Sequence, residues 1–251
     1  IYLMNIIIWN ECYISGGADW SLIDLITSWP NKNDNFTIYI NKNHEGYDLI
    51  SLKTKKNATI KPFYFVNEVA DSFIGSIWIK KTPKILKQQI RKLLKIITLI
   101  LSPFLYWPLI SNKKCDILIL NNGGYPGGLS NYVISFIAKL KNISRRYMIV
   151  RNFPVTSSIV FPFTNIISNF SMTKIITVSN ALREEMIKNT SINKDLIVKI
   201  HNGISLNNKL SEKENIDMSK KYNGDLFASI IGTFEDRKGH EVLFNAWVEV
   251  N

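Results

Sequence analysis

The sequence predicts an α/β fold built on a doubly wound, mainly parallel sheet. Short runs rich in Ile, Val and Leu alternate along the chain with stretches of helical periodicity, and this order of elements is typical of parallel sheets. Several runs are apolar without interruption, as expected of strands that helices cover on both faces. Apolar residues make up 46% of the 251 residues, which supports a sizeable core and excludes a disordered chain.

Seven of these runs are expected to be strands. The first begins just after Met4, which could be the initiator, and its apolar part is shorter than the roughly 7–15 residues of a signal-peptide core. We therefore interpret it as a buried first strand and expect a cytoplasmic protein. The expected strands are residues 5–9, 36–40, 59–65, 116–120, 147–151, 174–178 and 196–201.

Five stretches with apolar residues three or four positions apart are expected to be helices. A polar stretch over 205–224 is typical of a linker, and a further strand is expected at 225–231. The sequence thus predicts a first domain over 1–204 and, after the linker, the first strand and helix of a truncated second domain over 225–251. The expected helices are residues 19–28, 84–101, 129–140, 181–189 and 240–250.

The formal net charge of +11 is concentrated in one part of the chain. No acidic residue occurs from Ser72 to Cys115, where nine basic residues do, and the rest carries 22 basic and 20 acidic residues. This distribution does not indicate a nucleic-acid partner. The two cysteines, Cys12 and Cys115, fit a reducing compartment, and with the three histidines they show no spacing typical of a metal site.

Residues 80–112 join a basic half to an apolar half. The uncharged part, 96–112, is 17 residues long, short of the about 20 that a membrane-spanning helix needs, and Pro103 and Pro108 would interrupt it. A basic helix followed by a stretch rich in Leu, Ile, Phe, Trp and Tyr is typical of a membrane interface. We expect contact with an anionic membrane surface. The alternatives are a surface helix whose apolar side packs on the core, and a spanning helix.

Three glycine-containing segments follow expected strands. SGGAD at 15–19 and NNGGYPGG at 121–128 would lie at the carboxyl ends of strands, where doubly wound sheets bind ligands, and IGTFEDRKGH at 231–240 opens the last helix. Amide groups at a helix start attract phosphate, although a tight turn or a charged surface turn would use the same residues. The histidines are expected to be a solvated loop residue (His44), a turn residue (His201) and a first-turn helix residue (His240).

Taken in order, six segments resemble the family 4 glycosyltransferases of the GT-B fold. The NNGGYPGG segment is similar to that of members that build bacterial surface polysaccharides. The matching segments are spread over almost the whole chain: SGGADWSLIDL (15–25), DILILNNGGYPGG (116–128), MIVRNFP (148–154), KIITVSNALREEM (174–186), VKIHNGIS (198–205) and IGTFEDRKGHEVLFNAW (231–247).

The resemblance implies two Rossmann-like domains, an amino-terminal one for the acceptor and a carboxyl-terminal one for a nucleotide-diphosphate sugar. It also implies retention of anomeric configuration, with no metal and no cofactor besides that donor substrate, and it leaves the catalytic residue unassigned. The residues implied to bind the donor are Gly16, Gly17, Gly232, Thr233, Lys238 and Gly239. Those implied to line the acceptor cleft are Asn122, Gly123, Gly124, Tyr125, Arg151 and Asn152.

The chain departs from the family pattern in three places. Thr233 stands where the family often has Arg, which removes one cation. Arg151 stands where many relatives have His. It could hold a phosphate, but it stays protonated at neutral pH and cannot relay a proton. The family's paired-glutamate motif lies beyond Asn251, so we expect the 251-residue chain to be inactive alone.

The resulting hypothesis is a glycosyltransferase fragment, peripheral on the inner face of the cell membrane of a bacterium. It would move a sugar to a polysaccharide or lipid-linked acceptor in surface polysaccharide biosynthesis. Two alternatives stay open: a non-catalytic, acceptor-binding half of a split enzyme, and a nucleotide-sugar epimerase on the same fold.

Overall fold

The computed structural model of the protein describes residues 3–65, 83–111, 115–157, 160–203, 228–232, 234 and 236–250. The chain forms two compact units, Ile1–Ile204 and Ser205–Asn251, which we call unit 1 and unit 2. The expected linker over 205–224 lies outside the described residues.

A seven-stranded parallel sheet forms the centre of unit 1, with the order β3-β2-β1-β4-β5-β6-β7. Every strand expected in unit 1 is present, and the predicted α/β, doubly wound fold class is confirmed. The strands are β1 (Asn5–Asn10), β2 (Asn35–Asn41), β3 (Ala58–Phe63), β4 (Ile117–Asn121), β5 (Arg145–Val150), β6 (Lys174–Thr177) and β7 (Ile197–Lys199).

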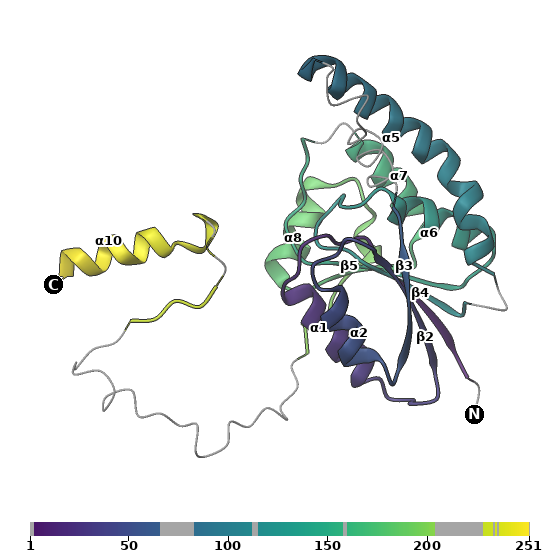
Figure 1. The fold of residues 1–251 in the computed structure, drawn as a ribbon, viewed down its shortest axis with the longest axis horizontal. Helices are drawn as coiled ribbons and strands as arrows, with labels where there is room; N and C mark the ends of the chain where they lie inside the picture. The colour runs from purple at the N-terminus through teal and green to yellow at the C-terminus, as the bar shows by residue number, and fades with distance from the viewer. Residues whose placement is uncertain are drawn as a thin grey trace. The chain divides into compact units, whose positions relative to one another are not determined.

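Helices cover both faces of the sheet (Figure 1). One face carries α1 (Gly17–Thr27) and α2 (Tyr47–Thr54), and the other carries α5 (Lys84–Tyr106), α6 (Ser130–Leu140), α7 (Phe161–Ser171) and α8 (Asn180–Asn189). Short 3-10 turns follow α5, at η1 (Trp107–Leu109), and precede β7, at η2 (Lys194–Leu196). Unit 2 contains η4 (Asp236–Lys238) and α10 (His240–Val250), which spans the residues expected of it.

Alternating side chains of each central strand enter two different cores. In β1, Ile6 and Ile8 pack with α1 and α2, whereas Ile7 and Trp9 pack toward α5 and α6. The indole of Trp9 lies 5.0 Å from the ring of Tyr106, centroid to centroid, so the end of α5 is fixed on the sheet by aromatic contacts. This period of two is what a strand buried on both faces shows.

Helix α5 continues five residues beyond its expected end at 101, although Pro103 lies within it. Proline lacks the amide that would bond to the carbonyl four residues earlier, which is that of Leu99. The Ser102 hydroxyl donates to this carbonyl at 2.8 Å. A side-chain donor therefore takes the place of the missing backbone donor, and the prediction that Pro103 interrupts the segment is wrong.

Two helices of unit 1, α2 and α7, have no counterpart among the expected elements. Helix α2 is only eight residues long. Helix α7 turns polar residues inward, so its apolar periodicity gives no sign of a buried face. In unit 2, residues 228–231 belong to no strand, while the earlier part of the strand expected at 225–231 lies outside the described residues.

Candidate functional site

The candidate site lies at the carboxyl ends of β1, β4 and β5. The chain leaves β1 toward β2 and β3, and leaves β4 in the other direction toward β5, β6 and β7. Loops that follow adjacent strands at such a reversal diverge and form a crevice, which is where doubly wound sheets bind ligands. The segments that follow these strands are residues 11–16, 122–129 and 151–160.

The side chain of Arg151 connects three of the elements at this edge. Its Nη1 donates to Asn121 Oδ1 at 2.7 Å and to the Asn122 carbonyl at 3.4 Å. Its Nη2 donates to Ser21 Oγ on α1 at 3.4 Å. Its Nε is buried and has no hydrogen-bond partner among the described residues. The guanidinium is thus placed by neutral groups and retains one unused donor.

Among the described residues, no carboxylate forms a salt bridge with Arg151. The salt bridge found there joins His44 to Asp19. Burial lowers the pKa of Arg151, but a guanidinium stays protonated at neutral pH. The nearby charge of Asp19 opposes this effect of burial without cancelling it, so the cation still bears a desolvation penalty. An anionic group that entered the crevice would reduce this penalty, so the arrangement favours a phosphate or carboxylate ligand.

Two buried asparagines at the ends of β1 and β4, Asn10 and Asn121, position Arg151 through a chain of hydrogen bonds. Asn121 Nδ2 donates to Asn10 Oδ1 at 2.9 Å, which leaves Asn121 Oδ1 to accept from the arginine. Because an amide side chain carries its donor and its acceptor on separate atoms, Asn121 connects β1 to the cation. Asn10 was not found by sequence reasoning, since an asparagine at the end of a strand is a common turn residue.

The glycine-rich loop after β4 has a fixed shape. Asn122 Nδ2 donates to the Pro126 carbonyl at 3.2 Å. Gly127 has a φ of 64°, and a Cβ there would lie 2.1 Å from Asn122 Oδ1, so only glycine fits. The Gly123 carbonyl accepts from the Asn152 amide at 2.9 Å. The loop after β4 and the loop after β5 therefore form one structure.

The residues implied to line an acceptor cleft divide into two groups. Tyr125 is 1% exposed and its hydroxyl donates to Asn165 Oδ1 at 2.7 Å, while Asn122 is 5% exposed. The side chains of these two residues shape the loop from within. The accessible members of the set are Gly123, Gly124 and Arg151, which are half-buried, and Asn152, which is exposed.

Gly16 and Gly17 are exposed at the start of α1, and no atom lies within 4 Å of the position that a Cβ would take on either. The Gly16 amide donates to Asp19 Oδ2 at 3.2 Å, and the Asp19 amide donates to the Gly16 carbonyl at 3.0 Å. The loop is therefore open to a ligand on one side. However, the amide of Gly16 is already engaged.

His44, expected in solvent, is instead buried against Asp19. Their Nε2 and Oδ1 atoms are 3.0 Å apart and both side chains are 0% exposed. Burial alone would raise the pKa of Asp19 and lower that of His44. The hydrogen bond and opposite charges outweigh burial, so the pKa of Asp19 is lowered and that of His44 is raised. Sequence reasoning missed the pair because the two residues are 25 positions apart in a polar context.

The loop after β2 holds the loop after β1 through this pair and its neighbours. The Ser15 amide donates to Glu45 Oε2 at 3.2 Å, and the Glu45 amide donates to the Tyr13 carbonyl at 3.0 Å. A Cβ on Gly46 would lie 2.4 Å from Asp19 Oδ2. The backbone of Gly46 thus packs directly against the carboxylate that orients Gly16.

A cavity of about 490 Å³ opens beside Arg151, within the size range of small-molecule sites. Ser21 and Asn202 both line it, and Ser21 Oγ donates to Asn202 Oδ1 at 3.1 Å. Sequence reasoning did not single out either residue, although both lie in segments that resemble the family, because nothing in the sequence shows that α1 and the end of β7 meet. His201 Nδ1 lies 3.0 Å from the Val178 carbonyl, which is a turn contact. The apolar wall of the cavity includes Leu25, Trp29, Ile149, Ile176, Val178 and Ile200.

Unit 2 contains the other residues implied to bind a donor. Gly239 has a φ of 72° and its amide donates to the Asp236 carbonyl at 3.1 Å, which closes the turn before α10. Lys238 is exposed, and its aliphatic carbons lie about 3.5 Å from the Cβ position of Gly232. These three residues therefore share one turn, while Thr233 lies outside the described residues.

No model of a known protein family matches the sequence, and no curated protein matches it closely. Among solved structures, a glycosyltransferase from Rickettsia africae matches with a TM-score of 0.62 and 17% identity over 100% of this chain and 58% of its own. Two further matches have lower TM-scores. These are the lipopolysaccharide outer core galactosyltransferase WaaB (0.45; 12% identity; 80% of this chain and 46% of that one) and MurG of Acinetobacter baumannii (0.46; 11%; 79% and 46%).

The likeness to the Rickettsia protein shows that the chain has the fold of a glycosyltransferase. The chain spans 58% of that protein's length. The expected GT-B type architecture agrees with this likeness, while membership of family 4 is a finer statement that the fold alone does not carry.

Proposed function

We propose that the protein is a retaining glycosyltransferase of the family 4 type, which moves a sugar from a nucleotide-diphosphate sugar to a polysaccharide or lipid-linked acceptor in bacterial surface polysaccharide biosynthesis. The observation that carries this proposal is the half-buried guanidinium of Arg151, which forms no salt bridge among the described residues and lies at the switch point of a glycosyltransferase fold. Donors with a diphosphate and lipid-linked acceptors both bring the anionic groups that such a cation stabilises.

The residues of the crevice take separate parts in the proposal. Arg151 binds a phosphate of the acceptor, and the exposed Asn152 and the backbone of Gly123 and Gly124 contact its sugar. Gly17, with the open side of Gly16, approaches the donor diphosphate at the start of α1, where the helix dipole favours negative charge.

In unit 2, Gly232, Thr233 and Gly239 form the donor loop, and Lys238 stabilises the leaving diphosphate. Charge on the leaving group grows in the transition state, so a fixed cation beside it lowers the barrier. The proposal requires no metal and no cofactor besides the donor substrate, and it places the enzyme on the cytoplasmic side of the membrane.

Sugar transfer by the product of the complete reading frame tests this function. Radiolabelled nucleotide-diphosphate sugars are offered with a lipid-linked acceptor fraction, and product is separated by charge and size. We expect Arg151→Gln to lower kcat/KM about 100-fold, because the loss of a hydrogen bond to a charged group costs up to about 3 kcal/mol of binding.

Arg145→Gln is the matched control, since Arg145 is exposed at the opposite end of β5. Its activity should equal that of the unchanged protein. Equal activity of the Arg151→Gln variant would remove the basis of the proposal. If the donor sugar were epimerised without any acceptor present, the reaction would be epimerisation rather than sugar transfer.

A further inference from the structure

Helix α7 is amphipathic in the reverse sense. The side chains that it turns toward the sheet are largely polar, and Thr164, Ser168 and Ser171 are each 0% exposed. Its apolar side chains point outward: Phe163 is 55% exposed, Ile166 66% and Phe170 50%. Because positions i, i+3 and i+7 lie on one face of a helix, these three side chains form a stripe on the surface of the protein.

The stripe on α7 continues onto α6. The rings of Phe170 and Phe136 have centroids 5.7 Å apart, and Lys139 Nζ lies 5.8 Å from the centroid of the Phe170 ring. Phe136 and Leu140 are both exposed on the outside of α6. The outer side chains of the two helices therefore form one apolar surface with a lysine at its edge.

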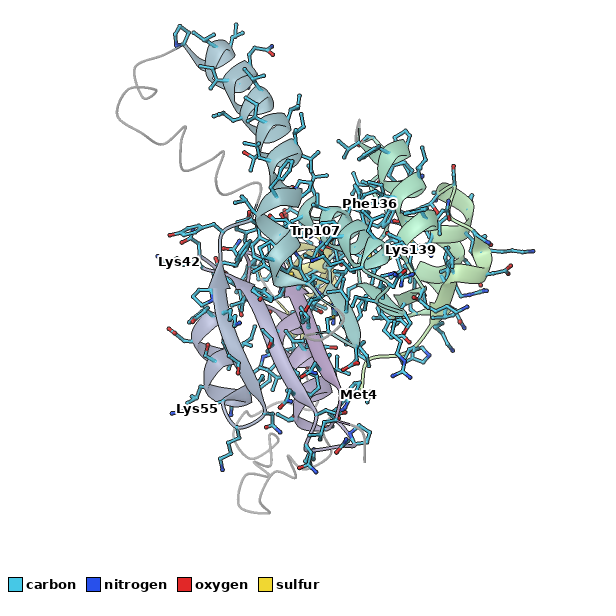
Figure 2. All side chains as sticks on the ribbon, turned by 90° about the vertical axis from the view of Figure 1, so that its right-hand side faces the viewer. Met4, Lys42, Lys55, Trp107, Phe136 and Lys139 are labelled. Atoms are coloured by element: carbon cyan, nitrogen blue, oxygen red, sulfur yellow. The ribbon has the colours of Figure 1, made fainter. Side chains whose placement is uncertain are left out.

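The end of α5 adjoins the same surface. Lys141, just after α6, donates from Nζ to the carbonyls of Trp107 and Ile110, both at 2.6 Å, and lies 4.4 Å from the centroid of the Trp107 ring. In the view of Figure 2, Trp107, Phe136 and Lys139 lie close together, apart from Met4 and Lys55. Trp107 is 47% exposed, so an aromatic ring faces solvent where α5 meets α6.

Helix α5 carries its own apolar stripe away from the core. Ser102 and Tyr106 are buried on the side that faces the sheet. On the other side, residues spaced four, three and four positions apart are all exposed: Leu93, Ile97, Ile100 and Phe104. A single surface thus runs over the outer faces of α5, α6 and α7.

These three helices contain no aspartate and no glutamate. From Ser72 to Arg183 the sequence has one acidic residue, Asp116, against sixteen basic residues. Accessible carboxylates lie on the other helices: Asp24 on α1, Asp48 on α2, and Glu184 and Glu185 on α8, which covers the same face of the sheet but is not part of this surface. An apolar, aromatic surface with lysines and without carboxylates is complementary to an anionic lipid bilayer, in which aromatic rings settle at the interface and lysines meet headgroups.

We propose that the outer faces of α5, α6 and α7 together dock the protein on an anionic lipid bilayer. Sequence reasoning assigned membrane contact to residues 80–112 alone; the structure adds α6 and α7 to it. Within the described residues, no helix combines the length and the apolar character needed to cross a bilayer. The proposal concerns a surface rather than the crevice, and its test does not depend on sugar transfer.

Flotation with lipid vesicles tests the surface. The purified protein is mixed with vesicles of phosphatidylethanolamine and phosphatidylglycerol, or with vesicles of phosphatidylcholine alone. We expect it to float with the anionic vesicles and to bind the neutral ones more weakly. Ile166→Ser on α7 and Phe104→Ser on α5 should each lower the partition coefficient about tenfold, because each removes one large apolar side chain from the lipid contact.

Leu52→Ser is the matched control. Leu52 is 74% exposed on α2, in the layer of the opposite face, so its replacement should leave flotation within about twofold of the unchanged protein. Circular dichroism and thermal unfolding check that the variants fold, which we expect because the substituted side chains are exposed.

Three results would overturn the proposal. The first is absence of flotation with anionic vesicles. The second is equal binding by Ile166→Ser and the unchanged protein, which would return the contact to α5 alone. The third is a dimer in sedimentation equilibrium that Ile166→Ser dissociates, without any vesicle binding, which would make a second copy of the chain the partner of this surface.

Discussion

Helices α1 and α7 are both eleven residues long and pack on opposite faces of one sheet, yet they bury opposite kinds of side chain. Helix α1 buries Leu22, Ile23 and Ile26, whereas α7 buries Thr164, Asn165 and Ser168 among others. The difference shows that an inward face need not be apolar, provided that its polar groups find partners. It also shows that the apolar residues of α7 are available for contact with something other than the core.

The inward face of α7 is satisfied by short hydrogen bonds. Asn165 Oδ1 accepts from the Tyr125 hydroxyl at 2.7 Å, and Ser171 Oγ lies 2.9 Å from Ser135 Oγ on α6. On the other face, the first turn of α1 relies on one ionic contact, between Asp19 and His44. Helix α7 is therefore held on the sheet by neutral hydrogen bonds, whereas α1 is held by apolar packing and one buried ion pair.

The largest effect is expected for Asp19→Ala. The change leaves His44 buried without its carboxylate and removes the acceptor of the Gly16 amide. We expect a loss of about 3 kcal/mol in the free energy of unfolding, as for other broken buried pairs. Urea unfolding at neutral pH measures it. Asp48→Ala, at an exposed position of α2, should cost under about 0.5 kcal/mol; equal losses would mean that the pair does not hold α1.

Gly46→Ala should have the next largest effect. Its Cβ would lie 2.4 Å from Asp19 Oδ2 and 2.8 Å from His44 Nε2, so the pair must shift. Overpacking of this kind costs about 2 kcal/mol. Gly16→Ala is the control, because no atom lies within 4 Å of its Cβ position and its φ of 178° suits any residue. A neutral Gly46→Ala would show that the loop after β2 is free to move away from α1.

The central strands of unit 1 could be predicted because they are buried on both faces. Continuous apolar runs such as IIIW in β1 are typical of such strands, and their order along the chain indicates the class of the sheet. Helix α7 could not be predicted in the same way. Its buried positions carry Thr, Asn and Ser, so periodicity contradicts burial until the partners Tyr125 and Ser135 are known.

The candidate site could be predicted in part. Glycine-rich segments after strands pointed to the crevice, and Arg151 was expected there from the resemblance to family 4 glycosyltransferases. The pairing of Asp19 with His44 was missed, because contacts between the ends of neighbouring strands depend on sheet order rather than on sequence spacing. Tyr125 was expected to line an acceptor cleft, but its ring is buried in the protein. No pattern in NNGGYPGG shows that this ring points inward.

Removal of the hydrogen bond between Tyr125 and Asn165 tests whether neutral hydrogen bonds hold α7 on the sheet. Tyr125→Phe and Asn165→Ala each delete one partner, and the double variant completes a thermodynamic cycle. We expect a coupling energy of about 1 kcal/mol, typical of one neutral hydrogen bond. Denaturant unfolding of the four proteins provides it. A coupling energy near zero would mean that α7 is held by packing alone, as α1 mostly is.

The smallest effect on the free energy of unfolding is expected from a change of pH. It distinguishes α1, which is held by a titratable pair, from α7, which is held by neutral hydrogen bonds. Asp19 has a lowered pKa, so its contribution is present above its ordinary value of 3.8 and is lost as the pH falls through the folded-state value. Burial opposes the rise in the pKa of His44, but Asp19, the Tyr13 carbonyl and the charge of Glu45 prevail. The contribution of His44 is therefore complete below its ordinary pKa of 6.5 and is lost as the pH rises through the folded-state value.

Unfolding by urea from pH 5 to 9 should show the unchanged protein losing more stability than His44→Gln above about pH 6.5. Asn165→Ala should parallel the unchanged protein, because the hydrogen bonds of α7 do not titrate in this range. A constant difference between His44→Gln and the unchanged protein across the range would show that His44 is not protonated in the folded state.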